Sequence, residues 1–220
     1  MKHSSGLIVF DMDSTLIHIE CIDEIARLNN RYTKVSAITE AAMRGEIDFA
    51  ESLTQRVACL EGIKESDLES LFSPIPFNPG AKELIQALQA AGWKTALVSG
   101  GFTWFANRVQ AALNLDAVIA NQLEVADGCL TGKVLGDIVD AKVKAEQLQQ
   151  LAGHWNIPSD RTVAVGDGAN DAVMLKAAAV GIAFNAKPAL QAIADYSVNS
   201  NNLLEILGCL KQSELIEPVI

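Results

Sequence analysis

Short polar clusters follow three apolar segments of this chain, and they hold the residues best suited to chemistry. The clusters are Asp11-Met12-Asp13-Ser14-Thr15, Ser99-Gly100-Gly101 and Gly166-Asp167-Gly168-Ala169-Asn170-Asp171. Asp11 and Asp13 are two residues apart, so on an extended backbone their side chains point to one side, and with Asp167 nearby we expect three carboxylates to crowd together. Carboxylates crowd together at low cost only where a cation neutralises them or where they share protons. Oxygen donors without a nearby histidine or cysteine favour Mg²⁺, an ion that also binds phosphate. Together the clusters indicate chemistry on a phosphate group, although each one alone is also typical of a turn or a helix cap.

The segments before these clusters predict the fold that positions them. Short apolar runs, typical of strands buried on both faces, occur at 7–10, 95–98, 117–120, 162–165 and 180–184. Helical patterns lie between them, so the expected class is α/β, with a doubly wound, mostly parallel, Rossmann-like sheet. Ligands bind beyond the carboxyl ends of such strands. We therefore expect the three clusters to line one crevice.

Residues 17 to about 75 interrupt the alternation of strands and helices. They carry helical patterns, among them a helix that begins at Asp48 and ends at Gly62, and the proline-rich stretch 73–76 closes the segment. We therefore predict two domains. An α/β core comprises residues 1–16 and 76–220, and a small helical cap of residues 17–75 is inserted after the first strand.

Local signals place three further elements. Asn78-Pro79 predicts a helix N-terminus, with the asparagine as cap and the proline as first helical residue, and Gly92 marks the end of that helix. Asp140 predicts the cap of a later helix. The Asp-Gly pair at 127–128 predicts a two-residue hairpin turn.

Two basic residues lie at positions where a positive charge is energetically unfavourable without a neighbouring anion. Arg56 falls on the apolar stripe of the helix that follows Asp48, which indicates an anion nearby; a snorkelling side chain or an internal salt bridge is an equally good explanation. Lys144 lies in the first turn of its helix, where a cation opposes the helix dipole, so we expect a neighbouring anion. Lys142 points elsewhere. Glu20 is weaker evidence, because acids are ordinary near a helix start.

The composition excludes several classes of protein. The 17 basic and 27 acidic residues give a formal charge of −10, whereas nucleic-acid binding needs positive charge. The 4 cysteines form no Cys-x-x-Cys pair, which excludes a zinc finger. The apolar run 7–10 is too short for a signal peptide, and no run approaches the ~20 residues of a membrane span. We expect a cytoplasmic protein with a small-molecule partner, and leave its oligomeric state open.

The three clusters, together with Lys144, resemble the haloacid dehalogenase superfamily of phosphotransferases over nearly the whole chain. With Glu20 and Arg56 added, they resemble its phosphoserine phosphatase branch. The resemblance implies a Mg²⁺-dependent phosphatase that converts O-phospho-L-serine to L-serine and phosphate through an aspartyl-phosphate, as the last step of serine biosynthesis. Some members carry an amino-terminal regulatory domain, which we do not expect in the ten residues before Asp11.

The resemblance also implies individual roles. Asp11 would be the nucleophile, and Asp13 would protonate the leaving oxygen and then accept a proton from water; proximity to Asp11 would raise the pKa of Asp13. Asp11, Asp167 and the backbone carbonyl of Asp13 would hold the metal. The substrate would contact Glu20, Met43, Phe49, Arg56, Ser99, Gly100, Lys144 and Asn170, with Asp171 supporting the phosphate and the metal.

Three other functions fit the same residues. A phosphotransferase would pass the phosphoryl group to an alcohol such as homoserine. A phosphatase could act on another small phosphate ester. A signalling module would be phosphorylated on Asp11 without turnover, and this is the alternative that the predicted cap and Asp13 disfavour.

Overall fold

The protein, described here by a computed structural model over residues 6–216, is built on one seven-stranded sheet. The strands are β1 (Leu7–Phe10), β2 (Lys94–Phe102), β3 (Ala117–Ala126), β4 (Cys129–Leu135), β5 (Thr162–Gly166), β6 (Val180–Phe184) and β7 (Tyr196–Val198). Their order is β4-β3-β2-β1-β5-β6-β7, and every neighbouring pair is parallel except the β3–β4 hairpin. The predicted fold class is confirmed. The ends of the predicted core, 1–5 and 217–220, lie outside the described residues.

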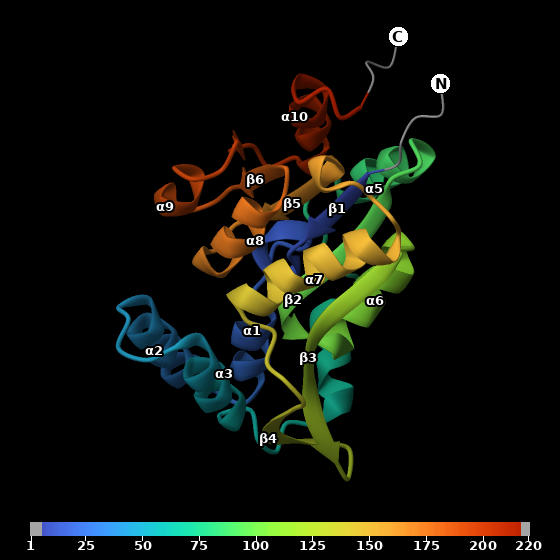
Figure 1. Ribbon diagram of the computed structural model, residues 1–220. Helices are drawn as coiled ribbons and strands as arrows, with labels where there is room; N and C mark the ends of the chain where they lie inside the picture. Colours follow the sequence, from blue (N-terminus) through green and yellow to red (C-terminus); the bar gives the residue numbers. More distant parts are fainter. Residues whose placement is uncertain (1–5, 217–220) are drawn as a thin grey trace.

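Helices cover both faces of this sheet (Figure 1). They are α1 (Cys21–Leu28), α2 (Tyr32–Met43), α3 (Phe49–Ala58), α4 (Glu69–Phe72), α5 (Ala81–Ala90), α6 (Thr103–Leu113), α7 (Ala141–His154), α8 (Ala172–Ala177), α9 (Pro188–Gln191) and α10 (Ile206–Gln212). Ile8 and Phe10 of β1 pack with α5, α6 and α10, whereas Leu7 and Val9 pack with α7 and α8. Burial on both faces explains the uninterrupted apolar strands. Over residues 6–216, no helix combines the length and the apolar character needed to cross a membrane.

The strand order places the three polar clusters on one edge. β1 lies between β2 and β5, and the chain builds the sheet outward from β1 first on one side and then on the other. A crevice opens beyond the carboxyl ends of strands at such a switch point. Asp11 and Asp167 directly follow β1 and β5, and Ser99 lies in the last part of β2, three residues before its end.

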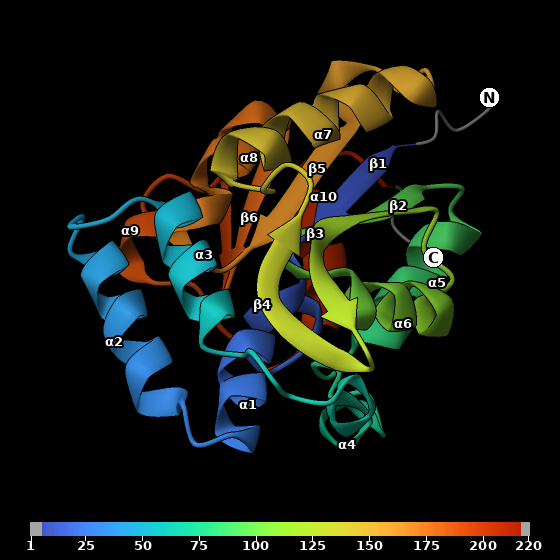
Figure 2. The same cartoon turned by 90° about the horizontal axis from the view of Figure 1, so that it is seen from below.

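Residues 17–75 supply the helices that lie beyond this edge. Figure 2 shows α1, α2 and α3 side by side, and Figure 1 shows them apart from α5, α8 and α10. Further along the segment, Phe72 of α4 packs edge-on against Phe105 of α6, with ring centroids 4.9 Å apart. Single bridge pairs join Ile17 to Phe77 and Lys64 to Cys129. The segment is helical, as its sequence indicates, and its division as a separate domain stays a prediction.

The prediction of Asn78 as a helix cap is wrong. Helix α5 begins at Ala81, and its N-cap is Gly80, which has a φ of 81°. The Asn78 side chain instead donates hydrogen bonds to the carbonyls of Thr15 (2.7 Å) and Ile17 (3.1 Å). Its amide is thus bound to the turn that follows β1, and the helix starts two residues later than predicted. The pattern of short apolar runs also failed to predict β7, a three-residue edge strand that is only partly buried.

The start of α7 and the β3–β4 turn agree with the sequence. The Asp140 carboxylate accepts hydrogen bonds from the backbone N–H groups of Lys142 (2.9 Å) and Val143 (2.8 Å), so it caps α7. Asp127 and Gly128 both have positive φ, as a tight hairpin turn requires. The cap at Asp140 fixes where α7 begins and therefore where Lys144, one turn later, is placed.

We predict that Asp140→Ala lowers the free energy of unfolding by about 1 kcal/mol, because two N–H groups at the start of α7 lose their acceptor. Urea unfolding followed by circular dichroism measures the change. Asp140→Asn keeps a cap acceptor and serves as the control. An alanine variant as stable as the wild type would contradict the assignment of this cap.

Candidate active site

A cavity of about 730 Å³ opens between the carboxyl ends of β1, β2 and β5 and the helices α2 and α3. Ten of the predicted site residues line it: Asp11, Asp13, Glu20, Met43, Phe49, Arg56, Ser99, Gly100, Asp167 and Asn170. Lys144 and Asp171 do not line it, because both side chains are fully buried beside Asp11. The predicted site residues thus fall into two groups. Ten line the cavity, and Lys144 and Asp171 form a buried support beside Asp11.

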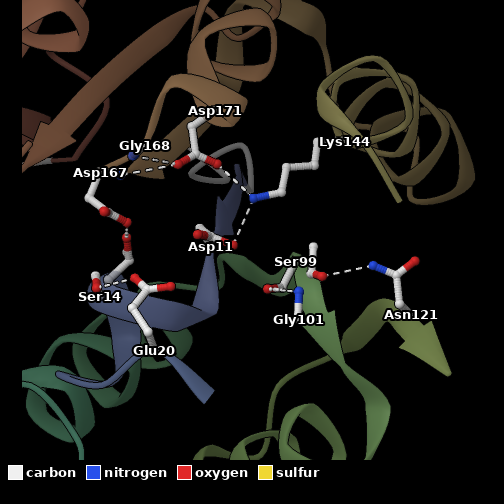
Figure 3. A network of polar contacts seen from close by, with 12 residues as sticks. Asp11, Ser14, Glu20, Ser99, Gly101, Asn121, Lys144, Asp167, Gly168 and Asp171 are labelled. Atoms are coloured by element: carbon white, nitrogen blue, oxygen red, sulfur yellow. Dashed lines mark hydrogen bonds and ion pairs between the residues drawn. The ribbon is translucent and has the colours of Figure 1, made fainter. Parts of the chain in front are cut away.

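The buried support is an ion-pair network around Lys144 (Figure 3). The Lys144 Nζ donates hydrogen bonds of 2.7 Å to Asp11 Oδ1 and 2.7 Å to Asp171 Oδ1. Burial disfavours the charged ammonium, but the two carboxylates outweigh burial and raise the pKa of Lys144 above its ordinary value. The sequence predicts an anion near Lys144, and the structure places two there, the carboxylates of Asp11 and Asp171. Lys142 pairs with Glu146 on the exposed side of α7.

Asp11, Asp167 and Asp171 form a carboxylate cluster that could hold a cation. One oxygen from each lies within 4.8 Å of the others. Burial, followed by the charges of Asp11 and Asp171, raises the pKa of Asp167 to about 8, despite a 2.9 Å hydrogen bond from Thr15 Oγ1. Burial raises the pKa of Asp171 to about 6 against the opposing charge of Lys144. In the absence of a cation, a proton replaces the missing positive charge.

The side chain of Asp13 lies outside this cluster, contrary to the expectation that it would crowd with Asp11 and Asp167. An extended backbone would place Asp11 and Asp13 on one side, but a tight turn over Met12–Leu16 follows Asp11, with Ser14 in the left-handed region at φ 56°. The side chain that completes the cluster is Asp171 instead.

Asp13 occupies an environment that favours its neutral form. Its Oδ1 is buried and has no hydrogen-bond partner among the described residues. Burial raises the pKa of Asp13 well above its ordinary value, and the charges of Glu20 and then Asp11 add to the effect. The sequence attributed this shift to Asp11; burial is the larger cause. A protonated carboxyl group at the cavity wall can act as a general acid.

The end of β2 presents a hydroxyl and two glycines to the cavity. The N–H of Gly101 donates to Ser99 Oγ at 2.9 Å. A Cβ at Gly100 would come within 2.9 Å of Phe49 Cζ, and one at Gly101 within 2.8 Å of Met12 Cε. A side chain at either position would have to displace Phe49 or Met12, so in this structure the backbone itself forms the wall.

Glu20 and Arg56 line the side of the cavity contributed by residues 17–75. Ser14 Oγ donates a hydrogen bond to Glu20, whose pKa is raised by burial. The Nε of Arg56 donates only to the Ser52 carbonyl, at 3.3 Å, and no carboxylate of the described residues lies within 4.0 Å of its guanidinium. The internal salt bridge left open by the sequence is thus absent from the described part of the chain. Arg56 is a half-buried cation free to take an anion.

Four further residues of the site were not singled out from the sequence. Asp23 and Lys187 line the cavity, Thr15 binds Asp167, and Asn121 binds Gly100 from β3. Thr15 belongs to the first polar cluster and could have been found there. Asn121 lies in an otherwise ordinary strand and carries no sequence signal.

We predict that the metal-free protein becomes less stable as the pH rises from about 5 to about 8. The folded state holds the Asp167 proton up to a pKa of about 8, against an ordinary value of 3.8, so the contribution is complete below 3.8 and is lost as the pH rises through 8. Urea midpoints in the presence of a chelator measure the slope. Asp167→Asn should flatten it, and Mg²⁺ should stabilise the wild type more at the upper pH. Equal slopes for wild type and variant would contradict the assignment.

Comparison with known proteins agrees with this geometry. Residues 8–176 match the family model of haloacid dehalogenase-like hydrolases. The chain is 98% identical, over the full length of both proteins, to a phosphoserine phosphatase of Idiomarina loihiensis.

Two solved structures share the fold. One is a phospho-aspartyl intermediate analogue of phosphoserine phosphatase, with a TM-score of 0.88 and 42% identity over 94% of this chain and 99% of that one. The other is a substrate-bound phosphoserine phosphatase complex, with the same TM-score and identity over 94% of this chain and 98% of that one. The polar clusters on one sheet edge, the family match and these similarities agree: the chain belongs to the haloacid dehalogenase-like hydrolases.

Proposed function

We propose that this protein is a Mg²⁺-dependent phosphatase that hydrolyses O-phospho-L-serine to L-serine and phosphate, as the last step of serine biosynthesis in the cytoplasm. The observation that carries the proposal is the pairing of two features in one cavity. Asp11 is buried at its floor beside Lys144, and Glu20 and Arg56 line its wall. The name of the 98% identical relative supports the same substrate.

The first step is transfer of the phosphoryl group to the protein. A carboxylate oxygen of Asp11 attacks phosphorus, and the bond between phosphorus and the seryl oxygen breaks. The leaving oxygen takes the proton of Asp13, whose raised pKa keeps that proton available. Lys144 holds the Asp11 carboxylate through Oδ1 and lowers the repulsion between this anion and the incoming phosphate. An aspartyl-phosphate and serine result.

The second step returns Asp11 to its starting form. Asp13, now ionised, accepts a proton from a water molecule whose oxygen attacks phosphorus. The bond between Asp11 and phosphorus breaks, and inorganic phosphate leaves. Ser99, the amide of Gly100, Lys144 and Asn170 are the groups that we assign to the phosphoryl oxygens in both steps. Lys144 has a third ammonium hydrogen beyond those bonded to Asp11 and Asp171, so it can serve both carboxylates and a phosphoryl oxygen.

The donor set fits a hard divalent cation such as Mg²⁺. We assign it to Asp11, Asp167 and the backbone carbonyl of Asp13, with Asp171 as support, because both Asp171 oxygens already accept hydrogen bonds from Lys144 and from the N–H groups of Asp167 and Gly168. Oxygen ligands alone, without nitrogen or sulfur, are the preference of Mg²⁺. When bound, the ion supplies positive charge that stabilises the transferring phosphoryl group.

The two charged residues of the wall match a zwitterionic amino acid. We assign the substrate ammonium to Glu20 and its carboxylate to Arg56, whose planar fork suits a carboxylate. Met43 and Phe49 complete the cover. We further propose that residues 17–75 act as a separate lid that excludes water during the first step and admits it for the second.

The activity itself is the first test. We predict that the protein with Mg²⁺ releases free phosphate from phosphoserine, that chelation abolishes release, and that Asp11→Asn lowers kcat by about 10⁴-fold or more. Acid quenching should trap a phosphoenzyme in the wild type and none in the variant. A screen of phosphorylated amino acids and sugars provides the comparison. Phosphate found on an added alcohol instead of free in solution would favour the phosphotransferase, and a trapped phosphoenzyme without turnover the signalling module.

Arg56 allows a test of substrate choice. We predict that Arg56→Ala lowers kcat/KM for phosphoserine by about 10- to 100-fold, the effect of losing a charged hydrogen bond, and changes that for an aryl phosphate much less. Steady-state kinetics on both substrates measure the difference. Arg108→Ala, which removes an arginine paired with Glu69 outside the cavity, is the matched control. Equal losses on the two substrates would refute the assignment of Arg56 to the carboxylate.

A further inference from the structure

Strand β2 departs from regular pairing where its polar cluster begins. Val98 pairs with Ile119 and Phe102 with Asn121, so three residues of β2 face a single residue of β3 between these pairs. The peptides of Ser99–Gly101 therefore lack regular partners on β3. Because unpaired peptide groups are costly in a protein interior, some other group must satisfy them.

The side chain of Asn121 supplies that partner. It is 1% exposed, and its Nδ2 donates a 2.8 Å hydrogen bond to the carbonyl oxygen of Gly100. Its Oδ1 accepts a 2.8 Å hydrogen bond from the backbone N–H of Val139, just before α7. One buried amide thus joins the end of β2, a contact drawn in Figure 3, to the segment that leads to Lys144.

The peptide between Gly100 and Gly101 is held at both ends. Its carbonyl is bound by Asn121, and its N–H donates to Ser99 Oγ at 2.9 Å. The two groups point in opposite directions across a trans peptide, so fixing one fixes the other. Since Ser99 Oγ accepts this hydrogen bond, and no described residue accepts the hydroxyl hydrogen, that hydrogen is available to a ligand in the cavity. Without Asn121, two consecutive glycines would let the peptide rotate.

We propose that Asn121 is a positioning residue for phosphoryl transfer. Through the Gly100–Gly101 peptide it orients the Ser99 hydroxyl toward a phosphoryl oxygen, and through Val139 it fixes the approach of α7 to the same site. This inference rests on the proposed function, because it concerns the group that the site transfers. Asn121 itself does not line the cavity, so it acts through Gly100 and Val139.

A double-mutant cycle with Ser99 tests the proposal. We predict that Asn121→Ala and Ser99→Ala each lower kcat/KM for phosphoserine about 10- to 100-fold, mainly through kcat, and that the double variant loses at least about fivefold less than the product of the two. Asn121→Leu has nearly the same size but offers neither the donor for Gly100 nor the acceptor for Val139. Its cycle should show the same coupling, and it replaces the alanine variant if that one does not fold.

Gln89→Ala is the matched control, because the Gln89 side chain is also an amide that binds two backbone groups, the carbonyls of Leu113 and Asn114, but outside the cavity. It should change kcat/KM less than about twofold. Losses that multiply, or an equal loss in Gln89→Ala, would overturn the role of Asn121. If the wild type does not hydrolyse phosphoserine, the proposed function fails on its own. The cycle is then measured on the affinity for inorganic phosphate with Mg²⁺, where coupling supports the positioning role and its absence refutes it.

Discussion

One buried ammonium group organises the acidic centre of this protein. Lys144 lies between Asp11 and Asp171 at 2.7 Å from each, and Asp167 completes the carboxylate cluster. If all three carboxylates are ionised, one ammonium leaves two negative charges unbalanced, which is the charge of one divalent cation. Burial, together with the same excess of negative charge, raises the pKa of Asp167 to about 8. Either a bound proton or a bound divalent cation can therefore reduce the excess negative charge of these three carboxylates.

The rest of the structure can be understood as the means of holding that centre in place. β1 and β5 bring Asp11 and Asp167 together, and the N–H of Asp11 donates to the Val165 carbonyl at 2.9 Å, so the sheet itself fixes the proposed nucleophile. The cap at Asp140 sets the start of α7 and hence the position of Lys144. Residues 17–75 contribute the opposite wall of the cavity, where Arg56 is left without a carboxylate partner among the described residues. Catalysis requires reacting groups held in fixed positions, as in the buried centre. Substrate choice requires a group that is free to bind the substrate, as Arg56 is in the cavity wall.

The sequence predicted most of this arrangement, for reasons that are local or topological. Strands buried on both faces are apolar throughout, so β1, β5 and β6 were recognisable, and the rule that parallel strands share a carboxyl edge was enough to join three clusters. Lys144 and Arg56 were recognisable because a positive charge at the start of a helix, or on its apolar face, is unfavourable unless an anion is near. The predictions failed at residues whose role depends on tertiary contacts. Asn78 binds carbonyls of a turn instead of capping a helix. Asp13 leaves the cluster because the backbone turns after Asp11. Asn121 acts on a strand irregularity that no residue pattern announces.

A crystal structure of the protein with Mg²⁺ and beryllium fluoride, which mimics an aspartyl-phosphate, tests the central claim most directly. The account predicts the beryllium fluoride group on a carboxylate oxygen of Asp11, the cation bound by Asp11 and Asp167, and the Lys144 Nζ still within hydrogen-bond distance of Asp171. An adduct on Asp13, or a cation bound away from Asp11 and Asp167, would contradict it.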